Sequence, residues 1–245
     1  MLVMTLPEQV PFFHGVEPVQ RVRDDVIDIH VAGDSKSGRR PAVIFVHGGP
    51  VPEDAEPRPR DWEGFIGYGA LAAAFGLVGI TFNHRLYTAM HYPHAADDVA
   101  AVVERTRALD MVDGDRIALW FFSGGGALAA SWLRDAPSWL RGIALTYPAL
   151  APPPSWPGDG PRFDAVTAVS AHPALPKLLV RVGDEIEFLA RTQDAFVKKA
   201  RDVDATLEVI ELPHASHGFE GHGYDAVARD AVDRAMSWIV SVLDR

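Results

Sequence analysis

Residues 117–126 read Ile-Ala-Leu-Trp-Phe-Phe-Ser-Gly-Gly-Gly, an apolar run that leads through Ser123 into three glycines. A short continuous apolar run is typical of a strand buried on both faces, as in a parallel sheet. The alanine-rich segment that follows predicts a helix. A strand that turns into a helix at a serine predicts a nucleophile elbow, in which a strained backbone lifts the hydroxyl clear of the sheet.

The elbow requires small neighbours, and Gly124 and Gly125 satisfy this requirement on the helix side. The departure from the usual Gly-x-Ser-x-Gly pattern is Phe121, which stands where that pattern has glycine. We expect Gly126 and Ala127 to leave room for this ring. The alternative interpretation of the stretch is a glycine-rich helix start with a capping serine.

Similar apolar runs recur along the chain and alternate with helical patterns. The other runs are Ala42–Val46, Leu77–Phe82, Ile143–Tyr147, Leu178–Val182 and Leu207–Ile210. Apolar residues at helical spacing predict helices around 99–106, 189–200 and 228–242. This alternation predicts an α/β protein with a doubly wound, mostly parallel sheet, whose catalytic groups lie at the carboxyl ends of the strands.

The remaining segments complete the predicted organisation. Alternation in Ile27–Val31 predicts an antiparallel edge strand that is solvated on one face. Two proline-rich stretches, 50–60 and 148–161, predict irregular loops that wall the site. We expect a single domain over 1–245, with a small lid or cap insertion at 148–176.

A second motif, Ile44 to Pro50, also ends a predicted strand and contains His47-Gly48-Gly49. Acyl transfer needs two backbone N–H groups aimed at a developing oxyanion, one of them from the residue after the nucleophile. This predicts an oxyanion hole formed by Gly124 and Gly49, because Pro50 has no N–H to donate. A plain glycine turn is the alternative.

A serine nucleophile needs a base and an acid that orients it. His217 lies between the last predicted strand and the C-terminal helix and is followed by Gly-Phe, so we favour it over His214 in the same loop. Asp184 comes soonest after the preceding strand, and we choose it as the acid. Glu185 and Glu187 are nearby alternatives, and a helix-capping role for Asp184 is another.

Together these motifs resemble the α/β-hydrolase superfamily, near its dienelactone-hydrolase-like and hormone-sensitive-lipase-like esterases, over nearly the whole chain. The order Ser123, Asp184, His217 is the order of that superfamily. The segments 83–86 and 92–99 are similar to its Tyr-Arg-Leu and Pro-Ala-x-x-Asp-Val segments, where we expect Arg85 to form a structural ion pair. Dienelactone hydrolases proper use a cysteine, and the lipase-like branch has a third glycine where this chain has Pro50.

Other features of the sequence bear on ligands. Trp62 and Trp156 are predicted to bind substrate, and together with Tyr68 and Phe163 they favour an apolar substrate. No His-Glu-x-x-His pattern, phosphate-binding loop or dinucleotide-binding glycine pattern is present in the sequence. We therefore expect neither a metal nor a cofactor.

Composition limits the class of protein further. The formal net charge of −10 disfavours nucleic acid and anionic membranes as partners, and without cysteine there is no thiolate nucleophile or disulfide. The apolar run 69–82 is too short to cross a bilayer, and no signal-peptide pattern is seen at residues 1–15. We expect a cytoplasmic protein that acts on small molecules, and base rates favour a homo-oligomer.

The function predicted from the sequence is hydrolysis of a carboxylic ester through an acyl-enzyme. Peptide, amide or lactone cleavage, or acyl transfer to another acceptor, would use the same residues. A non-catalytic small-ligand-binding protein on the same fold is the alternative from a different class.

Overall fold

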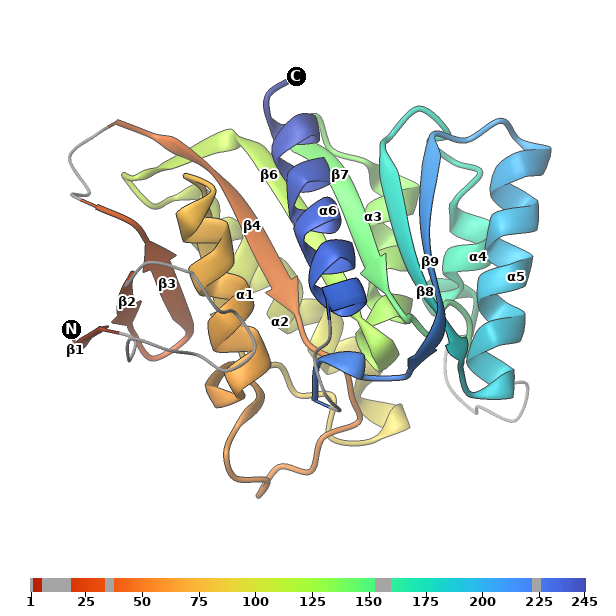
Figure 1. Ribbon diagram of the computed structural model, residues 1–245, viewed down its shortest axis with the longest axis horizontal. Helices are drawn as coiled ribbons and strands as arrows, with labels where there is room; N and C mark the ends of the chain where they lie inside the picture. Colours follow the sequence, from red (N-terminus) through yellow and green to blue (C-terminus); the bar gives the residue numbers. More distant parts are fainter. Residues whose placement is uncertain (1, 6–18, 34–37, 153–159, 222–225) are drawn as a thin grey trace.

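The computed structural model describes residues 2–5, 19–33, 38–152, 160–221 and 226–245 (Figure 1). Its strands are β1 (Leu2–Thr5), β2 (Gln20–Arg23), β3 (Ile27–Val31), β4 (Arg40–Val46), β5 (Val78–Phe82), β6 (Val112–Phe122), β7 (Leu140–Thr146), β8 (Lys177–Asp184) and β9 (Leu207–Ser216). Its α-helices are α1 (Glu63–Ala74), α2 (Tyr92–Arg107), α3 (Ala129–Asp135), α4 (Ala165–Ala168), α5 (Glu187–Asp202) and α6 (Ala226–Leu243). The 3₁₀ turns of the described residues are η1 (Pro59–Asp61), η2 (Ala89–His91), η3 (Ser123–Leu128), η4 (Gly160–Phe163) and η5 (Phe219–Gly221).

The strands form a nine-stranded sheet in the order β1-β2-β3-β5-β4-β6-β7-β8-β9. From β5 to β9 every pairing is parallel, whereas β1, β2 and β3 join antiparallel. The predicted mostly parallel sheet is therefore confirmed, and each predicted apolar run lies wholly or mostly within one of its strands. The carboxyl ends of the parallel strands meet at one edge, which is the lower edge in Figure 1.

Two hydrophobic cores lie on opposite faces of the sheet because successive side chains of a strand point to opposite faces. In β6, Ile117, Leu119 and Phe121 belong to the core shared with α2, α3 and α5. Ala118, Trp120 and Phe122 belong to the core shared with α1 and α6. Figure 1 shows α1 and α6 in front of the sheet and α2 and α3 behind it.

The ends of α5 follow the charge preferences of the helix dipole. In α5, Glu187 lies in the first turn, and Lys199 and Arg201 lie in the last. Negative charge at the start and positive charge at the end of a helix stabilise it. Glu187 belongs to this helix and not to the loop before it.

The prediction for Ile27–Val31 is wrong in two respects. The strand is antiparallel, but it lies inside the sheet between β2 and β5, and both its faces are buried. Asp28 is tolerated there because Arg21 and Arg23 pair with it, and His30 lies against Gly69 of α1. Buried polar residues with partners elsewhere in the fold thus produce the same alternating pattern as a strand with one solvated face.

The segment predicted as a lid, 148–176, lies partly outside the described residues. Its described part contains η4 and α4, and α4 packs against α3 and α5. A lid role for this segment stays a prediction. In the described part of the chain, no helix is both long enough and apolar enough to cross a membrane.

Candidate active site

Ser123 stands at the turn between β6 and η3, with φ of 47°. This is the left-handed region, which costs a non-glycine residue about 1–3 kcal/mol and persists only where the surroundings enforce it. Here the Ala149 N–H donates a 2.8 Å hydrogen bond to the Ser123 carbonyl. The hydroxyl is half-buried and lies on the wall of a cavity.

The glycines after Ser123 allow two backbone segments to touch. A Cβ atom on Gly124 would lie 1.9 Å from the Gly49 carbonyl oxygen, and one on Gly125 would lie 2.4 Å from the His47 carbonyl oxygen. Neither distance is compatible with a side chain. The turn after β6 is therefore packed directly on the His47–Gly49 loop that follows β4.

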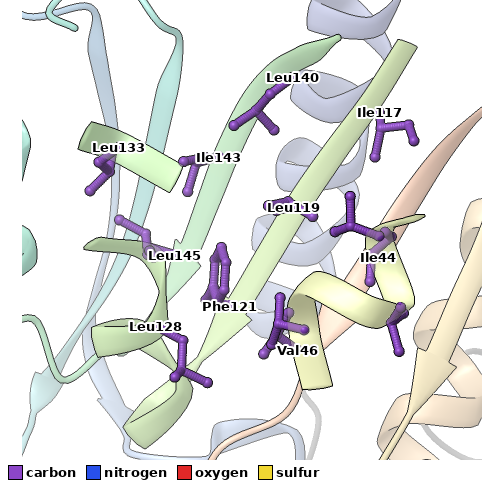
Figure 2. Close-up of a cluster of buried hydrophobic side chains, with 14 of the residues drawn as sticks. Ile44, Val46, Ile117, Leu119, Phe121, Leu128, Leu133, Leu140, Ile143 and Leu145 are labelled. Carbon is purple, nitrogen blue, oxygen red and sulfur yellow. The ribbon is translucent and has the colours of Figure 1, made fainter. Parts of the chain in front are cut away.

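Phe121 does not disturb this turn. Its side chain is fully buried and lies on the α2 and α3 side of the sheet, opposite to the face that carries Phe122. Figure 2 shows the ring among Val46, Leu128 and Leu145. Room is thus provided by the core itself as well as by Ala127, which belongs to the same cluster.

His217 faces the serine. Its Nε2 lies 2.7 Å from Ser123 Oγ, so the ring can accept the hydroxyl proton. His214 lies in β9 with an exposed side chain. The structure therefore brings together Ser123 and the histidine favoured from the sequence.

The acid that contacts His217 is Glu185, which corrects the prediction of Asp184. Glu185 Oε1 accepts a 2.8 Å hydrogen bond from His217 Nδ1, and its side chain is only 2% exposed. Asp184 ends β8 with its side chain in solvent. The physical reason lies in the strand pairing: the register between β8 and β9 shifts between Val182 and Asp184, so the two-residue alternation of the strand does not continue to the residue that turns inward.

Gln193 of α5 holds Glu185 in place and was not identified from the sequence. Its Nε2 donates a 3.2 Å hydrogen bond to Glu185 Oε2 and a 3.1 Å hydrogen bond to the Pro148 carbonyl. The side chain is fully buried. Within the helix pattern this residue reads only as a polar neighbour of Phe196, so no signal in the sequence distinguished it.

Two buried histidines shape the loop after β4. The backbone N–H of His84 donates a hydrogen bond to His47 Nε2, so this ring nitrogen carries no proton. The ring proton of His47 therefore resides on Nδ1, which donates to the Gly48 carbonyl oxygen at 2.6 Å. Because the Gly48 carbonyl and the Gly49 N–H belong to one planar peptide unit, this bond also orients the Gly49 N–H. The His84 ring stacks on that of His47 at 3.5 Å.

Burial governs the ionisation of both rings. It lowers the pKa of His84 to about 4 and that of His47 well below its usual value, and the positive charge of a protonated His84 lowers the pKa of His47 further. Both rings are therefore neutral at neutral pH. Their hydrogen bonds need neutral rings, since His47 Nε2 and His84 Nδ1 accept from backbone N–H groups.

The cavity has a volume of about 840 Å³ and is lined by Ser123 and His217 together with residues of the loop after β4 and of α1. Trp62, which was predicted to bind substrate, lies on its wall, and Pro50 and Pro57 from the first proline-rich loop do as well. Trp156 lies outside the described residues. Phe163 packs in the core against Tyr92 and not at the cavity.

Glu220 is a further cavity residue that sequence reasoning missed. It follows His217 by three positions, in η5, and its carboxylate accepts hydrogen bonds from Tyr68 and Tyr147. Tyr147 also packs its ring on that of His217 at 4.6 Å. The position of Glu220 in the histidine loop was the only signal for it in the sequence.

The segment after β5 that resembles the family motif connects α2 to the turn that carries Ser123. Arg85 forms the predicted ion pair with Asp98, which also accepts from the Arg85 N–H at 2.9 Å. Tyr92 donates its hydroxyl to the Gly124 carbonyl at 2.8 Å. Helix α2 is thereby tied to the turn that carries Ser123.

No sequence family model and no curated protein matches the chain. Solved structures do match it. A bacterial heroin esterase superposes with a TM-score of 0.73 at 17% identity, over 99% of this chain and 84% of that one. An esterase of Pyrobaculum calidifontis gives 0.67 at 20% identity, over 98% and 84%, and brefeldin A esterase, a bacterial homologue of human hormone-sensitive lipase, gives 0.67 at 14% identity, over 99% and 77%.

The sheet order and these superpositions define the chain as a protein of the α/β-hydrolase fold. The matched structures are described as esterases, and at 14–20% identity they show the fold that the motifs predicted.

Proposed function

We propose that this chain is a serine hydrolase that cleaves carboxylic esters of small molecules through an acyl-enzyme. The observation that carries the proposal is the continuous hydrogen-bonded series from Ser123 through His217 to Glu185, with the serine on the wall of a cavity. A nucleophile, a base and an orienting acid in this order activate a serine hydroxyl. The fold shared with solved esterases supports the same reaction class.

In the first half-reaction, Ser123 Oγ attacks the ester carbonyl carbon and its proton passes to His217 Nε2. The imidazolium keeps its Nδ1 proton, and the Glu185 carboxylate stabilises its charge. The N–H groups of Gly124 and Gly49 bind the oxyanion that develops on the carbonyl oxygen. Collapse of the intermediate breaks the ester C–O bond, and His217 protonates the departing alcohol.

In the second half-reaction, water attacks the acyl-serine while His217 takes its proton. The second tetrahedral intermediate collapses to release the carboxylic acid, and the proton returns to Ser123 Oγ. The proposed acid and base are thus restored. The mechanism requires no metal or cofactor.

The proposal predicts covalent labelling at one residue. A fluorophosphonate probe should label the wild type, while Ser123→Ala should fold and resist labelling. The Ser123→Ala substitution should also lower kcat on p-nitrophenyl esters by ~10⁴ or more, because it removes the atom that forms the covalent bond. Absence of labelling in folded wild-type protein would favour the non-catalytic binding protein instead.

Two controls separate ester hydrolysis from related reactions. His217→Ala should abolish the activity and His214→Ala should spare it, since only His217 contacts Ser123. p-Nitrophenyl esters of increasing acyl length, compared with matched amides, should show which acyl group and which leaving group the site accepts. Faster turnover of the amides would move the proposal from esterase to amidase.

A further inference from the structure

The cavity beside Ser123 contains a carboxylate that the proposed reaction does not use. Glu220 lies on the cavity wall, and each of its two oxygens accepts one tyrosine hydroxyl. Tyr68 donates to Oε1 and Tyr147 donates to Oε2, both at 2.7 Å. In the part of the chain that the structure describes, neither lysine nor arginine pairs with this carboxylate.

The charge of Glu220 is therefore incompletely compensated. Burial raises its pKa above the usual value even though the two tyrosine donors act in the opposite direction. A neighbouring positive charge would offset the cost of burying the carboxylate. Hydroxyl donors on both oxygens favour the ionised form, which is the form that can bind a cation.

Apart from Ser123, His217 and the Gly49 N–H proposed to bind the oxyanion, the described cavity wall carries mainly aromatic and acidic side chains. Five aromatic side chains line it: Trp62, Phe65, Tyr68, Phe122 and Tyr147. Aromatic faces attract ammonium groups. The other charged lining residues are acidic, and of these Asp61 already pairs with Arg21 and Arg23 while Glu63 is exposed. Among the described residues of the lining there is no lysine and no arginine.

We propose that this cavity selects esters carrying a cationic nitrogen, and that Glu220 and the surrounding aromatic rings bind that nitrogen while Ser123 attacks the carbonyl. The inference rests on the proposed esterase function and names its substrate class. It assigns to Glu220 a role in specificity that is separate from the role of Glu185, which contacts the histidine.

A competing role for Glu220 must be distinguished. Through its hydrogen bond to Tyr147, which packs on the His217 ring, Glu220 could serve only to position the histidine. A positioning role would affect all ester substrates equally, whereas a cation site affects charged substrates selectively. The two roles therefore differ in a ratio of rates.

The test compares acetylcholine, the acetate ester of choline, with 3,3-dimethylbutyl acetate, in which carbon replaces the charged nitrogen and the shape is kept. In the wild type, kcat/KM for the cationic ester should exceed that for the neutral one by ~10-fold or more. Glu220→Gln should lower kcat/KM for the cationic ester by ~10-fold more than for the neutral ester. Glu104→Gln, which removes one exposed charge of α2, should leave the ratio unchanged within ~2-fold.

A second measurement needs no variant of Glu220. Tetramethylammonium should inhibit wild-type hydrolysis of the neutral ester competitively, and tert-butanol at the same concentration should not. Calorimetric titration of Ser123→Ala with the two esters should show the same preference for the cationic one without turnover.

These arms separate the two proposals. If the wild type hydrolyses neither ester, the esterase proposal is contradicted. The titration of Ser123→Ala would still test the cation site in that case. Equal rates and equal binding of the two esters by the wild type would overturn the cation site even if hydrolysis is fast. Equal losses for both esters in Glu220→Gln would overturn it in favour of the positioning role.

Discussion

At the scale of single residues, the sequence did not show which of two adjacent acidic residues contacts His217. Asp184 and Glu185 are neighbours of like charge at the end of β8, and either could follow a buried strand. The shift in β8–β9 register decides which of them turns inward, and a register shift is a property of the paired strands and not of one segment. Ser123 and His217 were predictable because turn chemistry and chain order identify them locally.

The contact of Glu185 with His217 predicts unequal effects of two conservative substitutions. Glu185→Gln should lower kcat by up to ~10⁴, because the neutral amide no longer stabilises the imidazolium that forms during proton transfer. Asp184→Asn should change kcat by less than ~3-fold, since its side chain is in solvent. Kinetics of both purified variants with one ester would check this, and a larger loss in Asp184→Asn would return the acid to that residue.

At the scale of helices and strands, the sequence was informative where a segment shows a continuous apolar run or apolar residues at helical spacing. β4 to β9 and the helices α2, α5 and α6 were predicted from apolar runs and helical periodicity. β2 was not predicted, because Arg21 and Arg23 occupy a four-residue strand and become compatible with burial only through Asp28. Pairing between distant charges leaves no local pattern.

Contact between the turn after β6 and the loop after β4 gives a prediction at this scale. Gly125→Ala should destabilise the fold by ~1–3 kcal/mol, because the new Cβ would lie 2.4 Å from the His47 carbonyl oxygen and 3.2 Å from that of Val46. The same displacement of the loop should lower kcat by ~10-fold or more, since it moves a proposed oxyanion donor.

The matched control for this substitution is Gly64→Ala in the first turn of α1, where a Cβ would meet no atom within 4 Å. Its stability should be unchanged or up to ~1 kcal/mol higher, because alanine is the better helix former. Urea unfolding of the two variants and the wild type gives the comparison. Equal stabilities of Gly125→Ala and Gly64→Ala would mean that the two loops are not in the contact described.

At the scale of the whole molecule, the fold does not specify the substrate, because one α/β scaffold supports many acyl-transfer reactions. The proposed function assigns specificity to the few side chains that the strand ends and loops bring to the cavity, of which Trp62 was predicted from the sequence and Glu220 was not. The net charge of −10 acts over longer distances than these contacts and favours the approach of cations. The global charge and the local carboxylate therefore favour the same class of substrate.

The buried histidines of the two loops and of β3 predict how the whole molecule responds to acid. Burial lowers the pKa of His30 to about 3 and that of His84 to about 4, and it holds the pKa of His47 well below its usual value. In the unfolded chain these residues titrate near ~6.5. Between pH ~6.5 and 4, these histidines are protonated in the unfolded chain and neutral in the folded protein, so unfolding binds protons. The free energy of unfolding therefore decreases as the pH decreases.

The slope of this loss can be bounded. Each histidine that protonates only on unfolding lowers the free energy of unfolding by ~1.4 kcal/mol per pH unit, which gives at most ~4 kcal/mol per unit for the three. The raised pKa values of Glu220 and Asp233 act in the opposite sense, because a raised carboxyl pKa contributes stability at low pH that is lost as the pH rises. We therefore expect a net slope between ~1.4 and ~4 kcal/mol per pH unit.

Urea unfolding at pH 7.5, 6.0 and 5.0 measures this slope. The His30→Gln substitution should reduce this slope by ~1.4 kcal/mol per pH unit, because it removes one histidine that stays neutral in the folded protein. This reduction does not depend on how the substitution changes stability at pH 7.5. His214→Gln, at an exposed position of β9, is the matched control and should leave the slope unchanged. A free energy of unfolding that is constant between pH 6.0 and 5.0 would show that the buried rings accept protons in the folded state, and the hydrogen bonds that need a neutral His47 and His84 would then have to be rearranged.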